Sequence, residues 1–195
     1  MKKIFYAKAS YGQDEINAVL KVLKNPLTLM DGKNVKNFEK QIAKIFGKKY
    51  ALMVNSGSSA NLLALQCLNL KKNSEVITPL LTFSTTVAPI YQLGLYPYFV
   101  DVEEDTFNIS IQSLNEAILD VTKENIYKMK AIIAVDLYGL PANYNALKDI
   151  AKSYNLKLIA DAAQSFGAKY FNKKVGSLAD ITCVSFFPAK PLGCY

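Results

Sequence analysis

The stretch KLIADAAQ at positions 157–164 decides the fold class of this chain. Its first five residues predict a short strand that is apolar on both faces, which is typical of a sheet covered by helices on both sides. Similar strand-like segments lie at 50–54, 75–78, 97–102, 131–135 and 181–187. Helical patterns lie between and before them, at 13–23, 34–45, 58–68, 82–93, 111–121 and 142–154. Because strand and helix alternate, the sequence predicts an α/β fold with a mostly parallel sheet.

Composition restricts the class of protein. The chain has 195 residues, 51% of them hydrophobic, which is enough for one sizeable core in an ordinary globular domain. No apolar run approaches the roughly 18 residues of a membrane helix, so we expect no membrane partner and a cytoplasmic location. The net charge is +7, but the lysines are scattered along helices rather than gathered in an aromatic-rich stripe, so we expect no nucleic-acid partner.

The counts of histidine and cysteine exclude several kinds of catalysis. The chain contains no histidine and only three cysteines, without a Cys-x-x-Cys pair. These counts exclude Ser-His-Asp and Cys-His nucleophile systems and histidine-ligated metals, and we expect no metal site. Any general base must therefore be a Lys, Asp, Glu or Tyr side chain.

Two loops after predicted strands carry features of a ligand site. The segment NSGSSAN at 55–61 opens a helix, and free backbone N–H groups at such a start, together with the helix dipole, suit a phosphate group. The simpler alternative is that Ser56 or Ser58 only caps the helix. Phe83, in the loop after the next strand, could stack on a flat heteroaromatic ring or could pack in the core.

A carboxylate and an amine mark two further strand ends. Asp161 ends an apolar strand, where a carboxylate is costly to bury without a partner, although it could also cap a helix. Lys190 follows the segment at 181–187, where a lysine is otherwise a solvated turn residue. An amine and a carboxylate at neighbouring strand ends are the pair that pyridoxal 5′-phosphate (PLP) chemistry requires, since the amine forms a Schiff base and the carboxylate pairs with the pyridine nitrogen.

These motifs occur in the order seen in a known family. The motifs are NSGSSAN at 55–61, Thr82-Phe83, DAAQ at 161–164 and SFFPAKPLGCY at 185–195. With them the chain resembles the DegT/DnrJ/StrS family of PLP-dependent nucleotide-sugar aminotransferases. The resemblance implies the PLP-dependent transferase fold of aspartate aminotransferase (type I), with a seven-stranded, mostly parallel sheet flanked by helices.

The resemblance, with the turn-like NPLT at 25–28, also suggests how the chain is organised. We expect an N-terminal helical arm at 1–26 and a PLP-binding large domain at 27–195. Family members continue into a sheet-closing segment and a small C-terminal domain. We therefore expect the large domain to be incomplete at its C-terminal end and the small domain to be absent from this chain.

The resemblance implies a role for each matching residue. Lys190 would hold PLP covalently and, once free, would move a proton between substrate and cofactor. Asp161 would pair with the pyridinium nitrogen, Phe83 would stack on the ring, and Gln164 would lie near the phenolic oxygen. The phosphate would be held by three residues: Gly57 (through its N–H), Ser58 and Ser185.

The reaction implied by the resemblance is transfer of an amino group from glutamate to a keto carbon of a nucleotide-linked sugar. It would belong to the synthesis of lipopolysaccharide, other surface-polysaccharide or glycan precursors, and would be carried out by a homodimer with shared active sites. The run FPAKPLGCY at 187–195 is most similar to enzymes that aminate a 3-keto sugar.

Two alternatives stay open. One is a sugar dehydratase of the same family, which resembles 56–65 and 82–89 but carries histidine where Lys190 stands, and histidine cannot form the Schiff base. The other is a truncated member without catalysis, since the chain stops shortly after Lys190. Many relatives also have histidine where VDLYG at 135–139 has Asp136, and the role of Asp136 is open.

Overall fold

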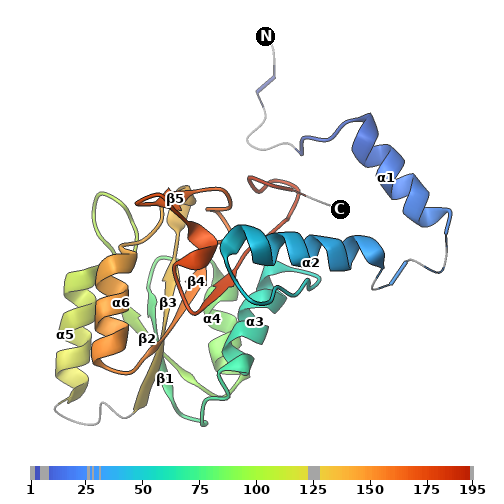
Figure 1. The fold of residues 1–195 in the computed structure, drawn as a ribbon. Helices are drawn as coiled ribbons and strands as arrows, with labels where there is room; N and C mark the ends of the chain where they lie inside the picture. Colours follow the sequence, from blue (N-terminus) through green and yellow to red (C-terminus); the bar gives the residue numbers. More distant parts are fainter. Residues whose placement is uncertain are drawn as a thin grey trace.

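A five-stranded parallel sheet with helices on both faces forms the body of the protein (Figure 1). The computed structural model describes residues 3–4, 9–25, 27, 29–30, 32–122 and 128–193. The strand order is β2-β1-β3-β4-β7, and each neighbouring pair is parallel. The strands are β1 (Glu75–Pro79), β2 (Tyr96–Val100), β3 (Met129–Val135), β4 (Lys157–Asp161) and β7 (Ile181–Cys183). The α-helices are α1 (Gln13–Leu23), α2 (Lys33–Phe46), α3 (Gly57–Cys67), α4 (Ser84–Gln92), α5 (Ile111–Thr122) and α6 (Tyr144–Ser153).

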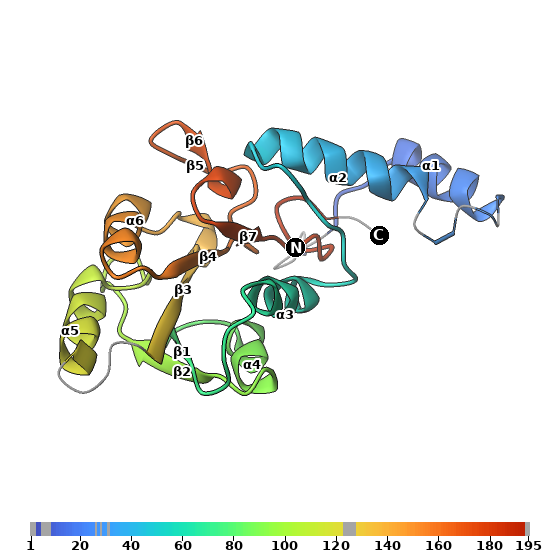
Figure 2. The same ribbon diagram turned by 60° about the horizontal axis from the view of Figure 1, so that its bottom comes forward.

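Each face of the sheet is buried under its own pair of helices. α5 and α6 lie on one side, and α3 and α4 lie on the other (Figures 1 and 2). Alternate residues of β3 divide between the two cores, since Ile132 packs on the α5/α6 side and Ile133 on the α3/α4 side. This two-sided burial explains why the strands are apolar throughout, and it confirms the predicted α/β fold with a mainly parallel sheet.

The predicted segment at 50–54 is not a strand, and here the prediction was wrong. Its residues are assigned no secondary structure and line a cavity that residues of β7 also line. A strand needs a neighbour about 4.8 Å away to accept its hydrogen bonds, and no described strand lies beside this segment. The described sheet therefore has five strands, where the resemblance implies seven.

The last predicted strand is also shorter than expected. β7 ends at Cys183, and residues 184–187 continue without sheet pairing. By contrast β4 has the predicted bounds, and the predicted helices agree closely with α1 to α6. Positions 194 and 195 of the final motif lie outside the described residues.

The remaining elements are small or peripheral. β5 (Lys169–Tyr170) and β6 (Lys173–Lys174) form an antiparallel hairpin, and two short 3₁₀ turns are η3 (Leu137–Gly139) and η4 (Val175–Ser177). α1 buries none of its residues and extends away from the body (Figure 1). The predicted arm at 1–26 is described only at 3–4 and 9–25, so its boundary at residue 26 stays a prediction.

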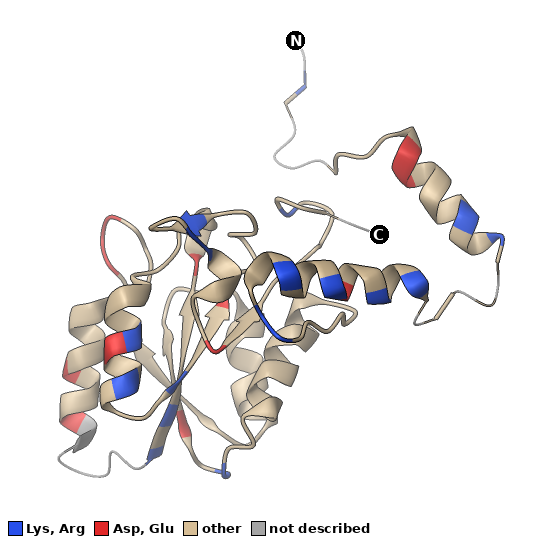
Figure 3. Ribbon diagram, in the orientation of Figure 1, with Lys and Arg blue, Asp and Glu red and all other residues tan. Residues whose placement is uncertain are grey.

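Charged side chains are distributed over many elements. Lysines occur on α1, α2, α6 and β3 rather than in one dense patch (Figure 3). Among the described residues, no helix has the length and apolar character needed to cross a bilayer.

Candidate active site

A cavity of about 1170 Å³ opens at the carboxyl ends of β4 and β7, between these strands, α2 and α3. In open parallel sheets this is the edge at which ligands bind. The seven residues predicted from the sequence all line it: Gly57, Ser58, Phe83, Asp161, Gln164, Ser185 and Lys190. The fold thus brings together residues from four separate loops.

Asp161 is the buried charge of the cavity wall. It ends β4 and is only 6% exposed. Its Oδ2 accepts hydrogen bonds from Asn61 Nδ2 (2.9 Å) and Thr86 Oγ1 (2.7 Å), and its Oδ1 accepts one from the N–H of Ala163 (3.2 Å). In the part of the chain that the structure describes, no lysine forms an ion pair with it. A carboxylate can accept about four hydrogen bonds, so Oδ1 has capacity for one more donor.

Asn61 and Thr86, the two side-chain donors to Asp161, were not predicted from the sequence. They come from α3 and α4, and Thr86 in turn accepts a hydrogen bond from Thr82 Oγ1 at 2.9 Å. A signal was present, because Asn61 shares a helix face with Leu65, and Thr86 with Ile90, in a 3.6-residue period. A polar residue on an otherwise apolar face indicates a buried hydrogen bond.

The start of α3 provides hydrogen-bond donors at the cavity. Ser56 is the N-cap, and its Oγ accepts from the N–H of Ser59 at 3.1 Å. The N–H groups of Gly57 and Ser58 belong to the first turn, which has no intrahelical acceptors. A Cβ on Gly57 would lie 3.1 Å from the Cβ of Ser185, so the glycine allows α3 to approach the segment after β7 closely.

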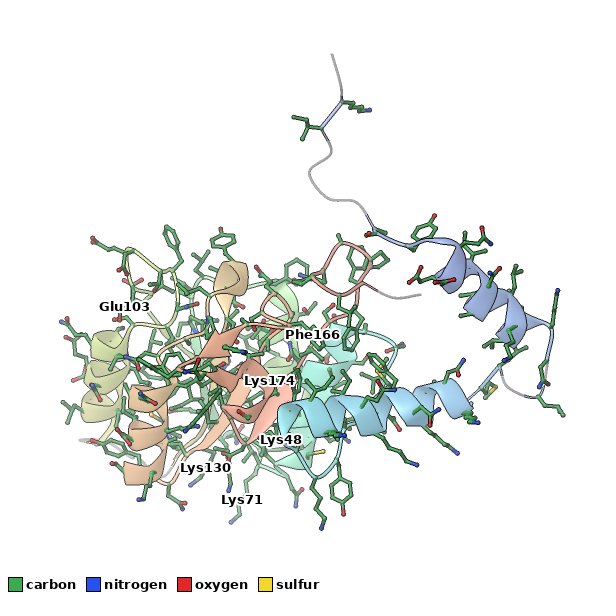
Figure 4. All side chains as sticks on the ribbon, turned by 45° about the horizontal axis from the view of Figure 1, so that its top comes forward. Lys48, Lys71, Glu103, Lys130, Phe166 and Lys174 are labelled. Carbon is green, nitrogen blue, oxygen red and sulfur yellow. The ribbon has the colours of Figure 1, made fainter. Side chains whose placement is uncertain are left out.

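Aromatic packing holds the segment after β7 in place. The Phe186 ring lies between Phe38 of α2 (centroids 5.0 Å apart) and Phe166 of the loop after β4 (5.5 Å), and Phe166 also contacts Phe46. Phe166 lies over the strand ends, close to the end of α2 (Figure 4). The neighbouring Ser185 lines the cavity. The N–H of Lys190 donates to the carbonyl of Phe187 (2.8 Å) and closes a turn, and Lys190 lines the cavity as well.

Phe83 and Gln164 also line the cavity. Phe83 is 71% exposed at the N-cap of α4, which excludes the alternative that it packs in the core. Gln164 Oε1 accepts a hydrogen bond from the N–H of Tyr138 at 2.9 Å. The cavity wall therefore offers an exposed aromatic face and an anchored side-chain amide.

Cys183 is buried in the same wall. Burial, and secondarily the charge of Asp161, raise the pKa of its thiol well above its ordinary value. A thiol that stays protonated is a poor nucleophile. Two lysines, Lys48 and Lys190, also line the cavity. Lys48 Nζ donates to the backbone carbonyls of Ala179 and Asp180, so the Lys190 amine is the candidate nucleophile of the two.

The structure is that of an α/β protein with a cavity at the carboxyl edge of a parallel sheet. The chain belongs to the DegT/DnrJ/EryC1/StrS aminotransferase family, whose model matches residues 9–195. It is 38% identical over 184 residues to the UDP-2-acetamido-2-deoxy-3-oxo-D-glucuronate aminotransferase of Pseudomonas aeruginosa, covering 94% of this chain and 49% of that protein. It is 39% identical to the GDP-4-keto-6-deoxy-D-mannose 3-dehydratase of Escherichia coli O55:H7, covering 93% and 46%.

Solved structures agree with this assignment. A DegT DnrJ EryC1 StrS aminotransferase from Brucella abortus superposes with a TM-score of 0.88 at 36% identity, covering 94% of this chain and 49% of that one. A Streptococcus pneumoniae protein solved in a PLP form matches with a TM-score of 0.89 at 26% identity, covering 98% and 51%. The chain thus spans about half the length of the relatives it matches.

Proposed function

We propose that the cavity binds PLP and that the protein transfers an amino group from glutamate to a keto carbon of a nucleotide-linked sugar. One observation carries the proposal: residues chosen from sequence motifs between positions 57 and 190 converge on a single cavity. Family membership supports the reaction class. The homodimer, the cytoplasmic location and the place in lipopolysaccharide or other glycan precursor synthesis are parts of the same proposal.

The donors around the cavity fit the two charged ends of this cofactor. The first N–H groups of α3 and the nearby hydroxyl of Ser185 suit a phosphate, which is favoured at a helix N-terminus. Asp161 is a buried carboxylate with capacity for a further donor, as a protonated pyridine nitrogen would be. PLP supplies an electron sink when bound, and Asp161 would strengthen it by keeping that nitrogen protonated.

The remaining residues would position the cofactor and transfer the proton at the substrate carbon. The Lys190 amine would hold the cofactor and then carry the proton at the substrate carbon, since the chain has no histidine to do so. The exposed ring of Phe83 would stack on the cofactor ring, and Gln164, whose side chain is anchored by the N–H of Tyr138, would lie near the phenolic oxygen. Together these contacts would orient the flat ring between the wall and Lys190.

The relatives leave a dehydratase as the second candidate. One named relative is a 3-dehydratase, at an identity close to that of the aminotransferase. The lysine at position 190, in a chain without histidine, favours amino transfer, because the dehydratases resembled by this chain use histidine there. The relative that acts on a 3-oxo sugar supports a 3-keto carbon as the acceptor.

Covalent trapping tests the proposal directly. The chain is mixed with PLP, reduced with borohydride, dialysed and digested, and the modified peptide is identified by mass spectrometry. We expect one PLP per chain on Lys190, and none in Lys190→Ala. Lys174→Ala, which removes an exposed lysine of β6, is the matched control and should label like the wild type. Cofactor that dialyses away from folded, reduced protein would contradict the proposal.

A further inference from the structure

Asp136 is a buried carboxylate that does not line the cavity. It follows β3 directly, is fully buried, and its N–H donates to the carbonyl of Asp161 at 3.0 Å. Val135 is the register partner of Asp161 across the β3–β4 ladder, and both line the cavity. Because successive residues of a strand point to opposite faces, the Asp136 side chain is directed to the α5/α6 side.

Three donors surround this carboxylate. Oδ1 accepts from the N–H of Ala142 (3.0 Å) and the hydroxyl of Tyr144 (2.8 Å), and Oδ2 accepts from Ser165 Oγ (2.7 Å). Tyr144 is fully buried and Ser165 is 2% exposed. In the described part of the chain no lysine pairs with Asp136, so these hydrogen bonds are what offsets the cost of burying its charge.

The donors belong to two different segments of the chain. Ala142 lies in the loop between β3 and α6, and Tyr144 is the first residue of α6. Ser165 lies in the turn after β4, which is closed by a hydrogen bond from the N–H of Ala168 to the Ser165 carbonyl (2.9 Å). That turn also carries Gln164, directly before Ser165. Asp136 therefore ties the loop after β3 to the cavity-lining loop after β4.

A second link between the two loops involves Gln164, the residue directly before Ser165. The N–H of Tyr138 donates to Gln164 Oε1, and Gly139, at φ +87°, lets the Gln164 carbonyl approach so closely that a Cβ would lie 3.1 Å from it. The loop after β3 thus holds the side chain of Gln164, and Asp136 holds the next residue, Ser165. Two adjacent anchors restrict this part of the cavity wall more than either one alone.

We propose that Asp136 is a positioning residue, which acts through Ser165 to hold the cavity-wall segment that contains Asp161 and Gln164. The identity of the ligand rests on the proposed function, but the tie between the two loops does not. The proposal assigns a role to the residue that stands where many relatives have histidine. It predicts that removal of the Ser165 hydrogen bond to Asp136 weakens ligand binding in the cavity, whereas removal of another hydrogen bond to the same carboxylate does not.

Two matched variants test this. Ser165→Ala and Tyr144→Phe each remove one buried hydroxyl donor from Asp136, but only Ser165 lies on the cavity-wall loop. PLP affinity is measured by equilibrium dialysis and stability by urea unfolding. We expect Ser165→Ala to weaken PLP binding about tenfold and Tyr144→Phe by less than about twofold, with similar losses of stability. Equal changes in PLP affinity, or none in Ser165→Ala, would overturn the proposal.

Amide hydrogen exchange without cofactor separates this proposal from the proposed function. The N–H of Ala163 donates to Asp161 Oδ1 and reports on the cavity wall, while the N–H of Leu147, bonded to the Asn143 carbonyl, reports on α6. Ser165→Ala should speed exchange at Ala163 about tenfold and leave exchange at Leu147 unchanged. Tyr144→Phe should speed exchange at Leu147 and leave exchange at Ala163 unchanged. If the wild type binds no PLP but the two variants show this pattern of exchange, only the proposed function is contradicted. The same exchange at Ala163 in both variants would overturn the positioning role.

Discussion

The loops after β3 and β4 each begin at a buried aspartate, yet the two carboxylates serve different parts of the molecule. Asp161 takes donors from α3 and α4 and lines the cavity. Asp136 takes donors from the loop before α6 and from Ser165, and is fully buried. They differ by one position in register, which turns the side chain to the other face of the sheet. One position along a strand end thus separates a carboxylate that lines the cavity from one that links two loops.

The largest effect is expected when the cavity carboxylate loses its charge. Asp161→Asn keeps the side-chain size but removes the partner proposed for the pyridine nitrogen. We expect the half reaction with glutamate to slow by about 10² to 10³-fold, in the range found when one preorganised electrostatic contact is removed. Rapid-mixing absorbance would measure the rate. Asp136→Asn is the control, and an equal loss in both variants would remove the distinction between the two aspartates.

The free energy of unfolding should depend more on Asp136 than on Asp161, the opposite of the order expected for the reaction rate. Asp136→Ala leaves Ala142, Tyr144 and Ser165 without their acceptor, and we expect the free energy of unfolding to fall by about 3 kcal/mol. Asp161→Ala should cost about 1 kcal/mol, because water in the cavity can reach the donors that it leaves. Urea unfolding at neutral pH measures both. A larger loss at Asp161 than at Asp136 would contradict the comparison.

A smaller effect is expected from the hydroxyl that supports Asp161. Thr86→Val has nearly the same shape but removes the donor to Asp161 Oδ2. We expect PLP affinity to fall about three- to tenfold, since hydrogen bonds to charged groups are worth about 1.5–3 kcal/mol and the Asn61 bond remains. Thr78→Val, at a buried threonine that is not among the cavity-lining residues, is the control. Unchanged affinity in Thr86→Val would show that Thr86 does not position Asp161.

The smallest effect concerns pH. Burial, and secondarily the charge of Asp161, raise the pKa of Asp136, while its bonds to Ser165, Ala142 and Tyr144 act in the other direction. The folded protein therefore holds this proton to higher pH than the unfolded chain, where the pKa is about 3.9. Its stability relative to Asp136→Asn should fall as pH rises from about 4 through the raised pKa, and then level off. Urea midpoints across that range measure the difference, and a rise with pH would contradict the sign.

Local patterns were enough to predict β4 and the helices, because their apolar periods and turn residues are contained in single segments. The segment at 50–54 has the same strand character but no neighbour, so propensity alone misassigned it. Asn61 and Thr86 were missed for a related reason. Their importance lies in a contact with Asp161, which is distant along the chain.

By itself the sequence determined the fold class, the family and seven of the residues that line the cavity, because short motifs with their own local structure contain them. Only the tertiary structure decided the direction of the Asp136 side chain, whose role the sequence left open: it turns away from the cavity that Asp161 lines. That choice depends on the register between β3 and β4, a relation between segments that no single motif contains.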